Sequence, residues 1–182
     1  MKHRPPIIFS ALRLLTLALA CAVLSVHADD YGDVNQLLRN GKAADAMAKA
    51  DAYLVAKPRD PQMRFLKGVI QRSAGQHAEA ISTFSQLTED YPELPEPYNN
   101  LAVLYAGQGQ LDKARGALEM AIRTNPGYAT AHENLGDVYA RLAGESYTQA
   151  LQFDSNNASL PPKLNLIREL LKPDNKASTL VR

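Results

Sequence analysis

The chain has 182 residues, with 20 Lys or Arg against 19 Asp or Glu and a formal net charge of +1 at pH 7. This near-neutral balance gives no support for nucleic acid or an anionic membrane surface as a partner recruited by charge. The single cysteine excludes a disulfide framework, so stability must come from packing.

Residues 1–28 predict a secretory signal peptide. Basic residues precede an apolar run at 14–26, which is too short to span a bilayer comfortably. Val26 and Ala28 are small or permissive side chains three residues and one residue before the predicted cut. We therefore expect cleavage after Ala28 and a mature chain that begins at Asp29; a retained membrane anchor is the alternative.

The predicted leader also changes the charge and the thiol content. It holds three basic and no acidic residues, so the mature chain would have 17 Lys or Arg against 19 Asp or Glu, a formal charge of −2. Cys21 lies inside the leader, so the mature chain would have no thiol. A second hypothesis is that Cys21 is lipidated, although Ala18 stands where bacterial lipoprotein signals usually have Leu.

Beyond the leader, three residue types recur every 34 positions. The series are Gly41, Gly75 and Gly109; Ala46, Ala80 and Ala114; and Pro58, Pro92 and Pro126. A fixed period of this length is typical of a solenoid of stacked supersecondary units. Glycine can take the positive φ that ends a helix, and the residue before proline is pushed out of the helical region. Each unit is therefore predicted to be a helical hairpin.

Residues of the third unit carry a family resemblance. They are Tyr98, Leu101, Ala102, Tyr105, Gly109, Ala114, Leu118, Ala121 and Pro126, and Asn134-Leu135-Gly136 with Tyr139 opens the next copy. This pattern resembles the tetratricopeptide repeat over about 30–154, with a weaker match where Lys67 and Gln71 replace the usual Leu and Tyr. The resemblance implies an all-α, right-handed superhelical solenoid of helical hairpins, with three full repeats, a shortened fourth and a C-terminal capping helix. It implies no particular activity.

The fourth unit departs from this pattern. Tyr139 and Ala150 are 11 residues apart, whereas the corresponding Tyr105 and Ala121 are 16 apart. Five missing residues leave too little chain for a turn, so we expect one helix over 129–154. A shortened hairpin that turns at Ala143-Gly144 is the competing hypothesis.

A last helix is predicted at about 160–171. Leu160, Leu164, Ile167 and Leu171 form its apolar stripe, as a helix that covers the end of a solenoid requires. The predicted organisation is a repeat domain over 29–172 followed by a disordered tail at 173–182.

Motifs for catalysis, metal binding and phosphate binding are absent from the sequence. His77 and His132 lie in different units and have no partner at catalytic or metal-ligand spacing, so both are predicted to be structural or surface residues. The sequence therefore predicts no catalytic residue, no metal site, no cofactor and no enzymatic activity.

The resemblance implies that the first helices of successive hairpins line a concave groove that holds segments of other proteins. The groove candidates are Arg72, Asn99, Asn100, Val103, Glu133, Asn134, Asp137 and Arg141, with Asn35, Arg39, Ser73 and Glu96 beside them. Asn100 and Asn134 each precede the signature Leu, where an exposed amide can both donate to and accept from a peptide backbone. On this hypothesis their replacement by Ala weakens partner binding and leaves the fold intact. The alternative is that Asn is simply a common family residue there.

The resemblance also bears on the kind of ligand. The subfamily that clamps acidic chain termini uses lysines, whereas Tyr31, Leu66 and Glu96 occupy those places here. That ligand class is therefore not expected.

These features predict a non-enzymatic scaffold of the bacterial cell envelope that is periplasmic or secreted and binds a partner protein or peptide in its groove. The alternative is a lipid-anchored assembly factor of a pilus or outer-membrane machine, tethered through Cys21. No nucleic acid is expected as a partner, and no membrane unless the chain is lipidated. The sequence does not predict an oligomeric state.

Overall fold

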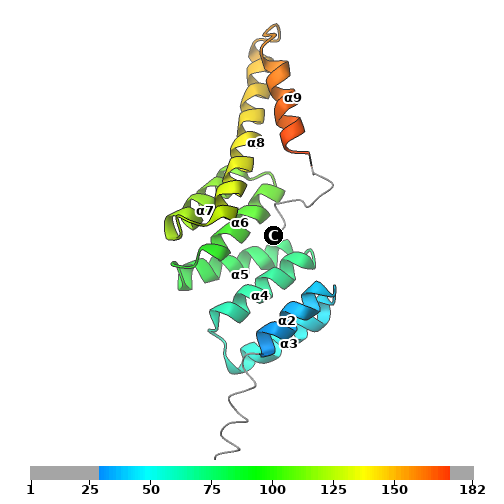
Figure 1. Cartoon of the computed structure of the whole chain (residues 1–182), viewed down its shortest axis with the longest axis vertical. Coiled ribbons are helices and arrows are strands. Elements are labelled where there is room, and N and C mark those ends of the chain that lie inside the picture. The colour runs from blue at the N-terminus through cyan, green and yellow to red at the C-terminus, as the bar shows by residue number, and fades with distance from the viewer. Residues whose placement is uncertain (1–28, 173–182) are drawn as a thin grey trace, which may run out of the picture. The chain divides into compact units, whose positions relative to one another are not determined.

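A computed structural model of the protein describes residues 29–172, which form eight α-helices and no strand (Figure 1). The predicted leader with Cys21 and the predicted tail at 173–182 lie outside the described residues. The chain divides into two compact units, one ending at Ala74 and the other beginning at Gly75. None of the helices between residues 29 and 172 combines the length and the apolar character needed to cross a membrane.

The first unit contains α2 (Asp29–Arg39), α3 (Ala43–Ala56) and α4 (Pro61–Ser73), and each of these helices packs against the other two. Its core consists of Val34, Ala46, Ala50, Met63, Leu66 and Ile70. Helix α4 starts sharply because the Asp60 carboxylate accepts a hydrogen bond from the Met63 backbone N–H (2.8 Å) and Pro61 stands at the first helical position.

The departure of α4 from the repeat pattern has a structural explanation. Lys67, which stands where the family has Leu, is half-buried and bonded to the Asp51 carboxylate of α3 (2.7 Å). Leu66 and Ile70 supply the buried apolar contacts instead, at 7% and 1% exposure. The helix therefore presents a different side to its neighbours from the one that the repeat pattern indicates.

The second unit contains α5 (His77–Asp90), α6 (Pro95–Gly107), α7 (Leu111–Thr124), α8 (Ala129–Phe153) and α9 (Leu160–Leu170). Each helix packs against the next, and α8 also contacts α6. The core consists of Ala102, Ala106, Leu111, Ala114, Leu118, Ala121, Ala131 and Val138. Alanines at the crossings let helix axes approach closely, since Ala114 and Ala121 have no exposed surface.

The predicted turn glycines are confirmed by the backbone. Gly41, Gly75 and Gly109 have φ values of 71°, 75° and 72°. After α6, the Gly109 N–H donates to the Ala106 carbonyl (3.1 Å) and the Gln110 N–H donates to the Tyr105 carbonyl (2.9 Å). These two bonds satisfy the last carbonyls of the helix and fix where the chain reverses.

The prediction of one long helix in the fourth unit is confirmed, and the alternative of a turn at Ala143-Gly144 is wrong. Figure 1 shows α9 running back alongside the C-terminal half of α8. A Cβ on Gly144 would lie 3.5 Å from Ile167 Cγ2, so this glycine faces α9. Helix α9 buries Leu160 and Leu164.

Candidate peptide-binding surface

Two of the predicted groove residues form a buried hydrogen bond. Asn134 Nδ2 of α8 donates to Asn99 Oδ1 of α6 (2.8 Å), and each residue is 1% exposed. Asn100 is 7% exposed, and its amide donates to the Glu96 carbonyl one turn earlier (2.9 Å). The expectation that Asn100 and Asn134 lie on an exposed face is therefore wrong: Asn134 is covered where α8 packs against α6, and Asn100 is buried as well.

The buried amide leaves one acceptor open. Asn134 Oδ1 is buried and has no hydrogen-bond partner among residues 29–172. A backbone contact from this residue to a partner therefore stays a prediction, and it would require a donor that reaches a covered oxygen.

The groove candidates fall in both units. Arg72 belongs to α4 of the first unit, together with Ser73, and α2 of that unit carries Asn35 and Arg39. Arg72 is half-buried, its Nη1 has no hydrogen-bond partner in the described part of the chain, and burial lowers its pKa. The remaining candidates lie on α6 and α8 of the second unit and form a surface that can be described by itself.

Helix α8 carries Glu133, Asp137 and Arg141 at intervals of four residues, hence on one side of the helix. Glu133 is exposed, whereas Asp137 and Arg141 are half-buried. Arg141 Nη1 donates to the Ala106 carbonyl at the end of α6 (3.2 Å), which holds the guanidinium between the two helices.

Helix α6 contributes an exposed carboxylate at its start and a half-buried Val103 further along. That carboxylate is Glu96. Burial of Tyr128 and, as a smaller effect, the negative charge of Glu96 both raise the pKa of the Tyr128 hydroxyl. The α6–α8 face, defined as Glu96, Val103, Glu133, Asp137 and Arg141, thus has three carboxylates and one guanidinium that is already hydrogen-bonded.

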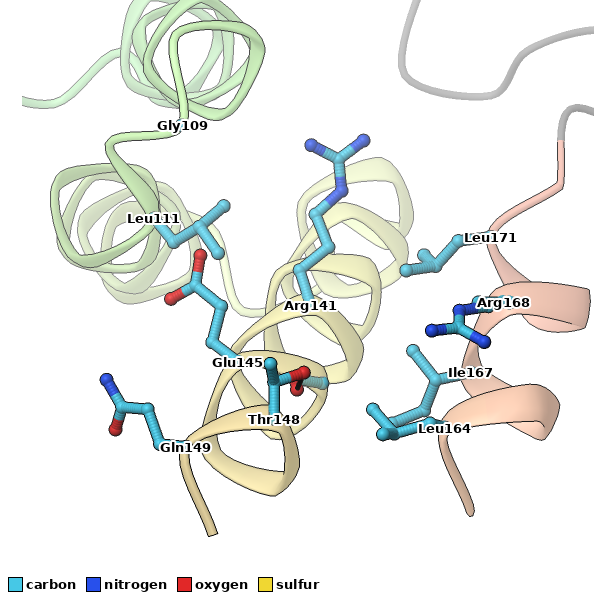
Figure 2. A pocket seen from close by; sticks show the side chains of 11 residues that line it. Gly109, Leu111, Arg141, Glu145, Thr148, Gln149, Leu164, Ile167, Arg168 and Leu171 are labelled. Atoms are coloured by element: carbon cyan, nitrogen blue, oxygen red, sulfur yellow. Dashed lines mark hydrogen bonds between the residues drawn. The ribbon is translucent and has the colours of Figure 1, made fainter. Parts of the chain in front are cut away.

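A cleft continues from this face along α8 (Figure 2). It has a volume of about 540 Å³ and is lined by Gly109, Leu111, Arg141, Gly144, Glu145, Thr148, Gln149, Leu164, Ile167, Arg168 and Leu171. Figure 2 shows Leu111 of α7 on one side and the apolar side chains of α9 on the other, with Arg141 and Glu145 rising from α8 between them. The lining combines apolar side chains of α7 and α9 with polar side chains of α8 and with Arg168 of α9, a mixture that can hold an amphipathic segment.

The shortened fourth unit explains the cleft. Helix α8 passes the α6–α7 turn without reversing, and α9 returns beside the C-terminal half of α8. Space therefore stays open between the start of α7 and α9. The sequence predicted the long helix but not the cleft, and the five missing residues were the signal that pointed to it.

Arg141 belongs to both surfaces, because it lies on the α6–α8 face and also lines the cleft. We call the combination, from Glu133 to Gln149 with the apolar wall of α9, the α8 surface. Metal chemistry has no evident site in residues 29–172, where no group of three or more His, Cys, Asp or Glu side chains is placed to hold an ion.

Comparison with known proteins identifies the repeat. Two family models described as tetratricopeptide repeat match residues 32–95 and 71–135, and together they span more than half of the chain. The chloroplast tetratricopeptide repeat domain-containing protein PYG7 of Arabidopsis thaliana is 36% identical over 88 residues. That match covers 46% of this chain and 29% of PYG7, so the chain spans less than a third of this relative's length.

Solved structures agree at the level of the fold. TTC0263, a thermophilic TPR protein of Thermus thermophilus, has a TM-score of 0.59 at 24% identity, over 80% of this chain and 82% of its own. The first TPR of Spaghetti (RPAP3), bound to the HSP90 peptide SRMEEVD, has a TM-score of 0.58 at 16% identity, over 64% and 92% of the two chains. Tetratricopeptide repeats are in general a non-enzymatic fold that binds peptides or other proteins. The chain belongs to the tetratricopeptide repeat family and has the helical-repeat fold of that family.

Proposed function

We propose that this protein is a scaffold of the bacterial cell envelope whose α8 surface binds a segment of a partner protein that carries Lys or Arg next to apolar residues. The observation that supports the proposal is the continuity of the α8 surface, which leads from carboxylates at Glu133 and Asp137 past Arg141 into a cleft with apolar walls.

The charge of the α8 surface favours a basic segment. Glu133 is exposed and Asp137 follows it one turn later, so a cation bound at this part of α8 meets two carboxylates, whereas the cleft holds Arg141 and Arg168 beside Glu145. Glu96 adds a third at the start of α6. An acidic peptide such as the one in the RPAP3 complex would instead meet like charges. Electrostatic complementarity of this kind sets which partner is accepted more than it sets raw affinity.

The apolar part of the partner would occupy the cleft. Leu111 stands on one side, and Leu164 and Ile167 stand on the other (Figure 2). An amphipathic helix or an extended segment with apolar residues on one side fits such a groove.

The envelope location rests on the predicted leader, which lies outside the described residues. Release of the protein by osmotic shock would support a soluble periplasmic scaffold. Extraction only by detergent would favour the alternative, an assembly factor that is tethered through a lipidated Cys21.

Site-specific photo-cross-linking in cells tests the binding surface. A photoreactive amino acid is placed at Glu133 or at Thr148, on the α8 surface, and at Glu119, an exposed position of α7, as the control. We expect one partner to be captured from both α8 positions and not from Glu119. Capture from Glu119 alone would move the binding surface elsewhere and overturn the proposal.

The charge preference is tested on the captured partner. The double variant Glu133→Lys/Asp137→Lys should weaken its binding by about tenfold or more, because two attractive contacts become repulsive. The control variant Glu119→Lys should leave the affinity within about twofold, since exposed charges away from an interface contribute little. Stronger binding by the double variant would show that the partner segment is acidic.

A further inference from the structure

The described structure ends at the edge of the cleft. Leu171 lines the cleft, and Lys172 is the last residue that the structure describes. Figure 2 shows Leu171 at the same end of the cleft as Arg141 and away from Gln149 at the other end. The segment that continues from Lys172 therefore starts beside the cleft, and it needs only to reverse its direction in order to run along it.

Residues 173–182 are long enough for this path. The lining residues Arg141 to Gln149 of α8 extend over about 12 Å, at a helical rise of about 1.5 Å per residue. An extended chain covers about 3.3 Å per residue, so about four residues span the cleft and the others can form the reversal. Pro173 with Asp174 and Asn175 is a combination typical of a turn.

The composition of residues 173–182 matches the cleft. Leu180 and Val181 are adjacent apolar residues, and Arg182 follows them directly. A base next to apolar residues is the chemistry that the proposed function assigns to a partner segment. The cleft offers the exposed carboxylate of Glu145 to the base and the half-buried side chain of Ile167 to the apolar pair.

The charges of the segment also occur in a favourable order. Asp174 follows α9 closely and so comes first to the end of the cleft where Arg141 lies, whereas Arg182 comes later and can reach Glu145. Arg141 donates through Nη1 to the Ala106 carbonyl (3.2 Å), but a guanidinium has five N–H donors and can bind a carboxylate as well. The opposite order of charges would place like charges together, which disfavours binding.

Attachment to α9 makes even weak contacts sufficient. A short tether gives an effective concentration of about 1 mM. A segment whose free peptide binds with a Kd of about 0.1 mM would then occupy the cleft in roughly nine of ten molecules. The same occupancy would weaken the binding of a competing partner by about tenfold.

We propose that residues 173–182 of this chain bind in the cleft beside α8, with Leu180 and Val181 against its apolar side chains and Arg182 at Glu145. The bound segment competes with the partner of the α8 surface and thereby regulates access to it. This competition rests on the proposed function, whereas occupancy of the cleft does not. Contacts with the cleft order a tail that is predicted to be disordered by itself.

Disulfide trapping tests where the segment binds. The full chain with Cys21→Ser has no thiol, so two cysteines can be added to it. The test pair is Val181→Cys with Thr148→Cys in the cleft, and the control pair is Val181→Cys with Glu119→Cys, at an exposed position outside the cleft. Under mild oxidation in dilute solution, the intramolecular disulfide should form about tenfold faster in the test pair. Equal rates, or disulfides only between molecules, would overturn the proposal.

A labelled peptide with the sequence of residues 173–182 tests the chemistry. Fluorescence anisotropy measures its binding to the full chain and to the shortened variant, which lacks residues 173–182. The peptide should bind the shortened variant about tenfold more tightly, because the attached segment competes in the full chain. Replacing both Leu180 and Val181 by Asp in the peptide should abolish binding, and unchanged binding would contradict the apolar contact. Circular dichroism verifies that the shortened variant keeps its helicity.

Charge exchange tests the contact between Arg182 and Glu145. Arg182→Glu in the peptide, or Glu145→Arg in the shortened variant, should each weaken binding by about three- to tenfold at low salt, since an attractive pair becomes repulsive. Combining the two changes should recover an affinity within about threefold of the original. Glu119→Arg is the matched control and should leave the affinity unchanged. Failure of the combination to recover affinity would overturn this contact.

The two proposals fail separately. A captured partner that binds the full chain and the shortened variant equally, together with a peptide that binds neither, would leave the partner site standing and overturn the binding of residues 173–182. Disulfide trapping and peptide binding without any partner captured from Glu133 or Thr148 would support the bound segment and contradict the proposed function.

Discussion

At the scale of single residues, the hydrogen bond between Asn134 and Asn99 fixes the register of α8 against α6. Both residues are 1% exposed, so water cannot replace either amide as the hydrogen-bond partner of the other. A buried hydrogen bond contributes about 0.5–1.5 kcal/mol net, but a buried group that loses its partner costs about 1–3 kcal/mol. The pair is therefore more important for specifying the packing than its net strength suggests.

Asn99→Ala should lower the free energy of unfolding by about 1–3 kcal/mol, because Asn134 Nδ2 then stays buried without an acceptor. Asn100→Ala is the matched control. It removes an amide whose Nδ2 donates within its own helix, to the Glu96 carbonyl, and should cost less. Urea unfolding measures the free energy of unfolding of both variants. An equal decrease in the two variants would show that the hydrogen bond between α8 and α6 does not stabilise the fold more than a bond within α6.

Asp60 is the second residue whose environment determines stability. Its Oδ2 accepts from the hydroxyls of Tyr31 (2.6 Å) and Tyr53 (3.2 Å), and its Oδ1 accepts from the Met63 N–H. Burial alone would raise the pKa of Asp60, but these hydrogen bonds and the charge of Lys57 lower it below the ordinary 3.8. The folded state therefore prefers the ionised carboxylate.

A depressed pKa makes this contribution to stability depend on pH. It is fully present above the unfolded pKa near 3.8 and is lost as the pH falls through the lower folded value. Tyr31→Phe removes the shortest of the hydrogen bonds, so it should cost about 1–3 kcal/mol at pH 7 and reduce the loss of stability in acid. Tyr139→Phe, at a tyrosine that is 49% exposed, is the control and should follow the wild type. Denaturant unfolding between pH 2 and 7 measures both, and an unchanged Tyr31→Phe profile would contradict the assignment.

At the scale of helices, the turn glycines are required by backbone conformation. Gly109 has a φ of 72°, which side chains of the L configuration rarely adopt, although no atom lies within 4 Å of an added Cβ. The constraint is thus one of backbone strain and not of space.

Gly109→Ala should therefore destabilise the protein by about 1–2 kcal/mol. Gly116→Ala, inside α7, has equally open surroundings but an ordinary helical backbone, and should stabilise by about 0.5–1 kcal/mol. Thermal unfolding should show a lower melting temperature for Gly109→Ala and a higher one for Gly116→Ala than for the wild type. A destabilising Gly116→Ala would show that a contact and not the backbone governs these positions.

Helix boundaries could be predicted because they depend on local chemistry. Glycine and proline at a fixed period locate the turns, and the five missing residues before Ala150 leave no chain for a turn inside α8. The environment of Asn134 could not be predicted in this way, since its burial depends on how α6 packs against α8. The five missing residues signalled an irregular fourth unit, but the cleft was missed because it also depends on where α9 returns relative to α7.

At the scale of the whole molecule, the proposed binding surface lies along α8, where the repeat pattern is interrupted. Regular repeats cover each other's apolar sides, and an irregular unit leaves surface uncovered. Helix α8 provides carboxylates and a cleft on one side, and α9 provides exposed leucines on its outer side. The deletion in the fourth unit is thus the origin of the cleft beside α8.

The last prediction concerns the chain that reaches its place of action. Val26 and Ala28 meet the small-residue requirement of a signal peptidase, so intact mass and N-terminal sequencing should give a start at Asp29, the first residue of α2. Cys21→Ser should leave the cleavage unchanged, whereas Ala28→Leu should block it by filling the position before the cut. A mature start at a modified Cys21, lost in Cys21→Ser, would contradict the prediction and favour the lipid-anchored alternative.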